Sequence, residues 1–236
     1  MNHILSALSP SGRALLAPIL EPVKLKPRQE LELPNRKITS VYFIETGVAA
    51  VLSISGGDRI AVALIGCEGA SGVGLFLGDD RSPNSTVMLT PGTGLRASAD
   101  AIRKAVEDVE TNRLFSRYAL AYFNQAEHTA LSNTMTSVPQ RVARWILMTH
   151  DRVPADTIPL TQETIALMLG TRRAGVTTAL NDLQQAGLVR LGRGAVTLLD
   201  RARLEELVGH FYGIPEQEFV RLVGTFWPPV PVPAGR

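Results

Sequence analysis

The chain has 236 residues, of which 45% are hydrophobic and 19% are charged, and its formal net charge is +2. This length suffices for two domains with modest cores, and the composition excludes an intrinsically disordered chain. The small net charge does not by itself identify a nucleic-acid-binding protein, although residues 139–201 hold eight arginines against five acidic residues.

Cysteine use and hydropathy indicate the expected compartment. Cys67 is the only cysteine, so the chain can form no internal disulfide and cannot alone supply the thiolates of an iron–sulfur cluster. We expect Cys67 to be a small buried hydrophobe rather than a redox sensor. We find no signal-peptide pattern and no run that approaches the roughly 20 apolar residues of a membrane span. A cytoplasmic protein without a membrane partner is therefore expected.

Short helices are expected first, within residues 3–19. Their leucine and isoleucine side chains are spaced to cover a neighbouring domain, and Ser9 with Pro10 interrupts the pattern. Serine followed by proline is typical of a helix start, because proline is well tolerated at the first helical position. We expect Pro10 to begin a second helix.

Residues 23–99 have the texture of an antiparallel β domain. Short apolar or alternating runs recur between glycine and aspartate turns, at residues 41–45, 48–55, 59–66, 86–89 and 95–99. The Ser-Gly-Gly-Asp sequence at 55–58 is a hairpin signal between two of these runs. Many short strands at this spacing predict a β-barrel or jelly roll. Because residues 23–99 contain no histidine, a metal site of the cupin kind is excluded.

A long helix is predicted after the barrel, over residues 111–135, which contain neither Pro nor Gly. Its apolar residues fall on several faces, so it needs two neighbours, which we take to be the barrel and the same helix of a second subunit. The residues expected at that dimer contact are Leu114, Tyr118, Ala121 and Gln125. A short helix at 100–106, with Asp100 as its N-cap, precedes it, and a helix at 140–150 with Trp145 facing inward follows it.

Residues 160–189 have the pattern of a helix-turn-helix. Two short helices each show one apolar face, formed by Ile165, Ala166 and Leu169, and then by Val176, Leu180 and Leu183. Gly170 stands between them, where a sharp turn requires a positive φ. The other faces of the second helix carry residue types that bind phosphates and base edges, namely Arg172, Arg173, Thr177, Thr178 and Asn181. This pattern predicts entry into the DNA major groove.

A wing and a closing helix are expected next. Two short strands, residues 188–191 and 195–199, flank Gly-Arg-Gly, which places Arg193 at the tip of a hairpin that can lie along the DNA backbone. Residues 200–209 form the closing helix in this prediction. For residues 211–236 we expect a short apolar helix packed on a neighbour and then an extended or disordered Pro-rich tail.

Other function classes find less support in the residues. The histidines show no metal-ligand spacing, and no Ser–His–Asp set or carboxylate pair suggests catalysis. We therefore expect no metal site, no catalytic residues and no enzyme. Two alternatives stay open. One is a helical hairpin within an enzyme, and the other is a β-barrel small-molecule-binding protein or enzyme with a helical oligomerisation module.

The order of barrel, long helix and winged helix-turn-helix resembles the Crp/Fnr superfamily of bacterial transcription regulators, most strongly over residues 160–199. The resemblance implies an α+β chain that acts as a sequence-specific regulator and reads an inverted-repeat operator. Its implied partners are double-stranded DNA, a second copy of the chain and RNA polymerase. The implied parts are a cyclic-nucleotide-binding-like barrel domain (1–110), a dimerisation helix (111–136), a winged helix-turn-helix domain (138–210) and a C-terminal extension (211–236).

The resemblance also assigns DNA contacts. Thr161 and Glu163 fall where family members contact phosphates, and Arg173 falls on an arginine that reads guanine, a contact worth ~1–3 kcal/mol of discrimination. Ala174 and Thr178 replace the Glu and Arg of the cyclic-AMP-responsive members, which implies a different operator. Base contacts are thus expected from Arg173, Ala174, Thr177 and Thr178, and phosphate contacts from Thr161, Glu163, Arg172 and Arg193.

The cyclic-nucleotide cassette of the family is incomplete in this chain. The family needs a Gly–Glu pair for the ribose and an Arg–Ser pair for the phosphate. Arg81-Ser82 is present with a one-residue shift, whereas Gly72 stands at the glutamate position. We therefore expect no cofactor, and a cyclic nucleotide is the less favoured ligand. The barrel is either a scaffold, with Arg81 in a structural loop, or a sensor for an unknown effector in a pocket of Gly72, Arg81, Ser82 and His128.

Overall fold

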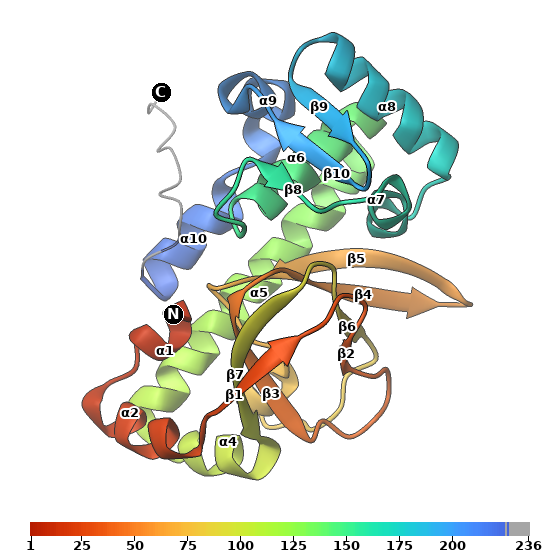
Figure 1. The fold of residues 1–236 in the computed structure, drawn as a ribbon. Coiled ribbons are helices and arrows are strands. Elements are labelled where there is room, and N and C mark those ends of the chain that lie inside the picture. The colour runs from red at the N-terminus through yellow and green to blue at the C-terminus, as the bar shows by residue number, and fades with distance from the viewer. Residues whose placement is uncertain (225, 227–236) are drawn as a thin grey trace.

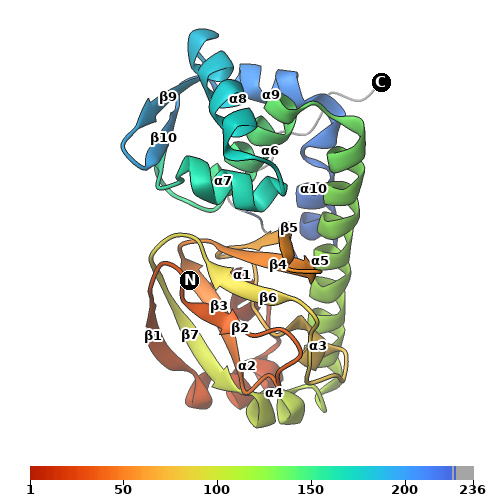
Figure 2. The ribbon, with the colours of Figure 1, turned by 90° about the vertical axis from the view of Figure 1, so that its right-hand side faces the viewer.

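A computed structural model describes residues 1–224 and 226 of the chain. The barrel lies at one end and the helix-turn-helix at the other, and one long helix runs along both (Figures 1 and 2). The antiparallel sheets and the C-terminal helix-turn-helix confirm the predicted α+β architecture.

Two antiparallel sheets face each other in the barrel, with strand orders β1-β7-β3 and β2-β6-β4-β5. Their strands are β1 (Glu21–Leu25), β2 (Glu30–Glu32), β3 (Ser40–Thr46), β4 (Ala49–Ser55), β5 (Asp58–Ile65), β6 (Ser85–Met88) and β7 (Gly92–Ser98). The expected hairpin joins β4 to β5, since Ser55 pairs with Asp58. The sheets enclose a core in which Ile44 of the first sheet packs with Val51 and Ile65 of the second.

Short helices surround the barrel. They are α1 (His3–Ser6), α2 (Pro10–Leu16), the 3-10 turn η1 (Ala17–Ile19), α3 (Val73–Phe76) and α4 (Ala99–Ala105). The predicted start at Pro10 is confirmed, because the Ser9 side chain accepts the Gly12 N–H. The N-cap expected at Asp100 is wrong. The side chain of Ser98 accepts the Ala101 N–H instead, and Asp100 lies within the first turn of α4.

Two side chains of α5 (Val109–Met135) fix this helix to the barrel. The Tyr118 hydroxyl donates to the Ala70 carbonyl and accepts the Ala70 N–H, both at 2.9 Å. Two turns further along the same face, Oε1 of Gln125 accepts the Leu64 N–H at 2.6 Å and Nε2 donates to the Leu64 carbonyl at 3.2 Å. Leu64 lies on β5, an edge strand, so Gln125 satisfies backbone groups that would otherwise be unpaired.

These contacts correct the predicted dimer face of α5. Tyr118, Ala121 and Gln125 are buried against the chain's own barrel, and Leu114 packs on the same cluster as Phe115. Tyr118, Ala121 and Gln125 are therefore not available to a second subunit, and Leu114 is only partly exposed. The large apolar side chains that α5 leaves exposed lie on another face, and they include Leu120, Phe123, Leu131 and Met135.

The C-terminal domain consists of α6 (Val138–His150), β8 (Thr157–Ile158), α7 (Gln162–Leu169), α8 (Arg173–Gln185), β9 (Val189–Gly192), β10 (Ala195–Leu198) and α9 (Arg201–Val208). Trp145 is buried at its centre, as predicted. The wing has a third strand that was not predicted, because β8 pairs with β10. A two-residue break, Thr136 and Ser137, separates α5 from α6, and Ser137 forms a capping box with Gln140.

The C-terminal domain is packed against the barrel. Val48, Ala50 and Leu52 of the barrel belong to the same buried cluster as the core of the helix-turn-helix. At the turn after α7, a Cβ added to Gly170 would lie 3.2 Å from Cδ1 of Ile60 on β5. The two domains thus share a core, which holds the helix-turn-helix at one place relative to the barrel.

The C-terminal extension forms the 3-10 turn η2 (Gly209–Phe211) and α10 (Ile214–Leu222), and α10 packs along α5 (Figure 1). The short helix expected after residue 211 is therefore present. The Pro-rich tail of the prediction, residues 228–236, lies outside the described residues.

Candidate nucleic-acid interface

The helix-turn-helix is formed by two helices joined by a turn at Gly170. The Thr161 side chain accepts the Thr164 N–H at 3.0 Å and so caps α7, and Gly170 ends this helix at a φ of +58°. Arg172 is the N-cap residue of α8. The buried face of α8 consists of Val176, Ala179, Leu180 and Leu183. The opposite face of α8 is consequently left to solvent.

Four of the predicted contact residues are exposed, namely Arg172 and Arg173 at the start of α8, and Ala174 and Thr178 on its solvent-facing side. Neither arginine forms an ion pair with any residue that the structure describes. Unpaired guanidinium groups at the start of an exposed helix can bind base edges or phosphates without first breaking an internal bond.

Thr177 occupies a different position from the one predicted. It is half-buried, and its hydroxyl donates to Oε1 of Gln162 at 2.8 Å and to the Arg173 carbonyl at 3.0 Å. Its donor is therefore used to hold α8 against α7. Gln162 also lines the hollow between α7, α8 and the wing, so it is a candidate phosphate contact that we did not predict. The sequence signal that could have indicated this contact is the position of Gln162 directly after Thr161, the N-cap of α7.

A hollow of about 300 Å³ brings the remaining predicted contacts together. Thr161 and Glu163 from α7, Arg173 from α8 and the glycines on either side of Arg193 line it. Arg193 itself is exposed at the tip of the wing between β9 and β10. Both helices and the wing therefore border one exposed surface.

The barrel contains a separate pocket of about 150 Å³ whose lining includes Arg81, Ser82, Glu32 and Tyr122. Oε1 of Glu32 accepts the Gly72 N–H at 2.7 Å and the Thr86 hydroxyl at 2.8 Å. Burial raises the pKa of Glu32, although these two bonds act in the opposite direction. A carboxylate of the chain thus occupies donors that an anionic ligand would need. Sequence spacing gave no signal for it, because Glu32 lies 40 residues before Gly72.

Two further predictions about this pocket are affected by the structure. The Arg81 side chain is 68% exposed and its Nε lies 3.9 Å from Asp80, which matches the structural-loop alternative. Gly72 does not line the pocket, although its N–H binds Glu32, which does. His128 does not line it either. It is half-buried elsewhere on α5, where burial and the charge of Arg144 lower its pKa. The expected grouping of His128 with Gly72, Arg81 and Ser82 is wrong.

Other candidate chemistry is limited. Cys67 is half-buried, and burial followed by the charge of Glu68 raises the pKa of its thiol to about 11. Within residues 1–224 and 226, no three His, Cys, Asp or Glu side chains are grouped as metal ligands. Among the described helices, none combines the length and the hydropathy that crossing a bilayer would require.

Known proteins share both the helix-turn-helix domain and the overall fold of this chain. The family model of the Crp-like helix-turn-helix domain matches residues 140–207. Among solved structures, FixK2 from Bradyrhizobium japonicum has 20% sequence identity and a TM-score of 0.70, over 81% of this chain and 98% of that one. No curated protein sequence matches the chain.

Two more solved structures are similar. A proposed Crp/Fnr-family transcriptional regulator from Eubacterium rectale has 21% identity and a TM-score of 0.67, over 86% of this chain and 96% of that one. A CRP-family regulator from Thermus thermophilus has 19% identity and a TM-score of 0.65, over 79% of this chain and 96% of that one. The chain therefore has the fold of the Crp/Fnr transcription regulators and carries their Crp-like helix-turn-helix domain.

Proposed function

We propose that this DNA-binding transcription regulator acts as a homodimer that reads an inverted-repeat operator, and that it has no enzymatic activity. The observation that carries the proposal is the exposed start of α8. There, Arg172 and Arg173 are free of ion pairs with described residues and lie beside the wing of a Crp-like domain. An arginine in this position can bind O6 and N7 of a guanine in the major groove. Because the target is chromosomal DNA, the proposal places the protein in the cytoplasm, with RNA polymerase as a further partner.

The exposed face of α5 supports dimerisation. Leu120, Phe123 and Leu131 share one side of the helix at 3.6 residues per turn, and they are 46%, 56% and 46% exposed. In Figure 2, α5 runs along one edge of the molecule. Apolar side chains gathered on one face of a long helix mark an interaction site, and the same face of a second copy is a matching partner.

We further propose that the barrel does not bind a cyclic nucleotide. Glu32 already accepts the Gly72 N–H, and a cyclic phosphate brought next to this carboxylate would meet like charge. The Gly72 position cannot supply the missing glutamate either. Its φ is +75°, and a Cβ there would lie 2.8 Å from Cγ2 of Val41. The barrel is then a scaffold or a sensor for a ligand that donates hydrogen bonds to Glu32.

Selection from random duplex DNA tests the main proposal. The purified full chain should enrich an inverted repeat whose half-site centres are about 34 Å apart, one turn of the double helix, or a multiple of that spacing. Enrichment of a single, non-repeated site would contradict the homodimer. A protein that enriches no sequence, with or without a cell extract that supplies small molecules, would contradict sequence-specific binding.

A further inference from the structure

The C-terminal extension is anchored at its base to the helix-turn-helix domain. The Tyr212 hydroxyl donates to Oδ2 of Asp151 at 2.7 Å, and Arg201 donates to Oδ1 of the same carboxylate at 2.7 Å. Nε of Arg144 on α6 donates to the Phe211 carbonyl at 3.0 Å. Asp151 and Arg144 are each only 2% exposed, so water does not compete for these bonds. The start of the extension must move with this domain.

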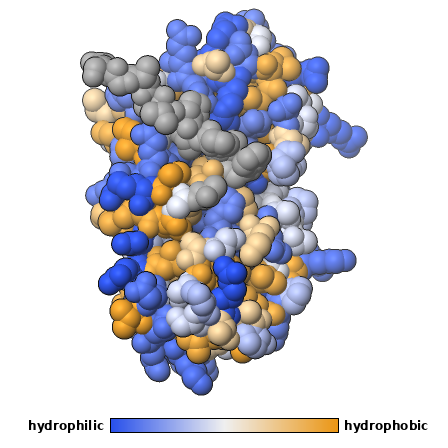
Figure 3. All heavy atoms as spheres, turned by 90° about the vertical axis from the view of Figure 1, so that its left-hand side faces the viewer, coloured by the Kyte–Doolittle hydropathy of each residue, from blue (hydrophilic) through white to orange (hydrophobic). Residues whose placement is uncertain are grey.

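The far end of the extension is seated on α5 and the N-terminal half. Phe219 of α10 meets Tyr118 edge to face with ring centroids 6.5 Å apart, and Phe226 meets Phe219 at 5.5 Å. On the side of the molecule that lies at the left of Figure 1, where α10 is, hydrophobic residues are next to one another on the surface (Figure 3). Tyr118 lies about 25 Å before the end of α5, at a rise of 1.5 Å per residue. The extension therefore reaches far past the break at Thr136.

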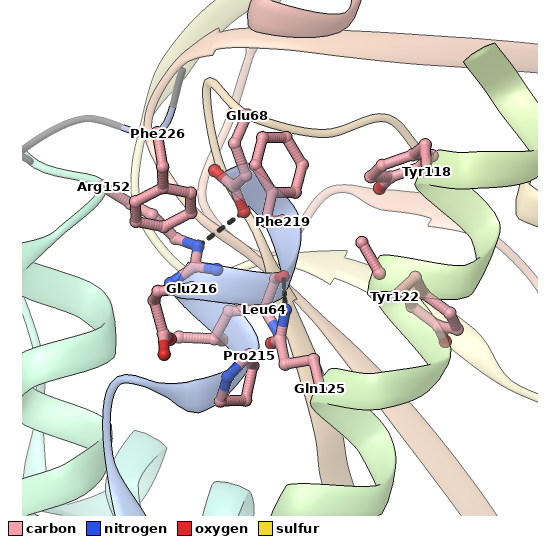
Figure 4. A pocket seen from close by; sticks show the side chains of 11 residues that line it. Leu64, Glu68, Tyr118, Tyr122, Gln125, Arg152, Pro215, Glu216, Phe219 and Phe226 are labelled. Carbon is pink, nitrogen blue, oxygen red and sulfur yellow. Dashed lines mark hydrogen bonds and ion pairs between the residues drawn. The ribbon is translucent and has the colours of Figure 1, made fainter. Parts of the chain in front are cut away.

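A buried ion cluster lies between these two anchor points. Nε of Arg152, just after α6, donates to Oε1 of Glu68 in the barrel at 2.7 Å. The Arg152 guanidinium also lies 5.4 Å from the ring centroid of Phe226. Glu216 of α10 is buried beside them (Figure 4). Burial and the negative charge of Asp151 raise the pKa of its carboxyl, while the positive charges of Arg152 and Arg144 act in the opposite direction. In the part of the chain that the structure describes, Oε2 of Glu216 has no hydrogen-bond partner.

Barrel, helix-turn-helix domain and extension thus meet at one place. If the helix-turn-helix domain rotated about Thr136 and Ser137, Arg152 would have to leave Glu68, or Phe219 would have to leave Tyr118. Separating a buried ion pair leaves charges without compensation, which is strongly unfavourable. Together with the shared core, the Arg152–Glu68 pair and the extension therefore restrain the direction in which α8 faces relative to α5.

We propose that Glu216 and Phe219 are positioning residues through which α10 fixes the separation of the two recognition helices, and so selects operators by half-site spacing. This inference rests on the proposed function, a homodimer that reads two half-sites. In a dimer, the α8 helices of the two subunits must reach successive turns of the major groove, which are about 34 Å apart. If α8 could move relative to α5, the dimer would bind operators with a wider range of distances between the half-sites. The base contacts within each half-site would stay unchanged.

The test compares three full-length variants with the unmodified chain. Glu216→Arg places a third positive charge beside Arg144 and Arg152, and Phe219→Ala removes the contact with Tyr118. Glu218→Arg is the matched control, because it makes the same charge change at a residue that pairs with Arg221 on the same helix. Each protein is selected on a library that holds the half-sites constant and varies the spacer. Affinities for the full repeat and for one half-site are then measured.

We expect Glu216→Arg and Phe219→Ala to accept spacers that differ by one base pair or more, and to bind the full repeat at least 10-fold more weakly. Half-site affinity should stay within twofold, and Glu218→Arg should retain the original spacing. Unchanged spacing in both variants would overturn the inference. So would a parallel loss of half-site affinity, which would indicate general damage to the domain. Should Phe219→Ala fail to fold, Leu222→Ala at the end of α10 replaces it.

Amide hydrogen exchange separates this inference from the proposed function. If the unmodified chain selects no operator, the proposed function fails, but the positioning role is still measured without DNA. We expect α7 and β5, which pack together, to exchange at least 10-fold faster in Glu216→Arg than in Glu218→Arg. Equal exchange in the two variants would overturn the positioning role.

Discussion

Replacing Tyr118 by Phe tests how α5 is held to the barrel. The substitution removes one oxygen that both donates to the Ala70 carbonyl and accepts the Ala70 N–H. Ala70 is fully buried, and Tyr118 is only 4% exposed, so water cannot replace the lost partner. Each buried backbone group left unsatisfied costs about 1–3 kcal/mol, so loss of both partners should lower the free energy of unfolding by about 2–6 kcal/mol.

Urea unfolding at one fixed protein concentration measures this change. Tyr122→Phe is the matched control one turn further along α5, because the Tyr122 hydroxyl makes no hydrogen bond within residues 1–224 and 226, and its loss should stay within about 0.5 kcal/mol. Sedimentation of Tyr118→Phe should show an unchanged dimer. A stability loss below about 0.5 kcal/mol, or a weaker dimer at unchanged stability, would refute the intrachain role of Tyr118.

Three further predictions follow from the same structure. Phe123→Asp should raise the dimer dissociation constant at least 100-fold in sedimentation, whereas Leu77→Asp, at an exposed position outside α5, should not; equal behaviour of the two would contradict the α5 interface. Millimolar cyclic AMP or cyclic GMP should leave the melting temperature unchanged, because we expect neither to bind the barrel. A ligand that did bind would raise the stability of the folded protein by about 2.7 kcal/mol at 100 times its Kd, so a clear rise in melting temperature would contradict the role of Glu32. Cys67, whose pKa is raised to about 11, should react with iodoacetamide at pH 8 about 100-fold more slowly than a thiol of pKa about 8.5, and urea should abolish the difference. Fast labelling of the folded protein would show that its thiol is not shielded.

The helix-turn-helix and the barrel could be predicted because their signals are local. Gly170 ends α7 with a positive φ, and the apolar steps of α8 match its buried face. The hairpin at residues 55–58 likewise joins two strands that are adjacent in sequence. In each case the residues that define the element lie within one or two turns of it, so periodicity and turn chemistry are sufficient.

The face of α5 could not be predicted because its partners are distant in sequence. Tyr118 and Gln125 recur seven residues apart among apolar neighbours, which is also the pattern of a dimer contact. Their actual partners are the backbone groups of Ala70 and Leu64, 48 and 61 residues away. A side chain that satisfies an edge strand or a loop cannot be distinguished by spacing from one that faces a second subunit.

The role of Glu32 in the pocket and the burial of Glu216 in the extension could not be predicted, for the same physical reason. Glu32 reaches Gly72 across the barrel, and its role depends on the fold of two sheets. Glu216 and Arg152 are brought together only because the chain returns along α5 after the wing. Charged residues at such positions are typical of solvated surfaces, and nothing local indicates that the fold buries them.

The most direct test of the regulator account is a paired selection from random duplex DNA with the unmodified chain and Arg173→Ala. The account predicts an inverted repeat for the unmodified chain, and for the variant the loss of preference at one base pair at the same position of both half-sites. That loss should correspond to about 1–3 kcal/mol of discrimination at each position. An identical motif from both proteins, or a loss in only one half of the repeat, would contradict a homodimer that reads DNA through α8.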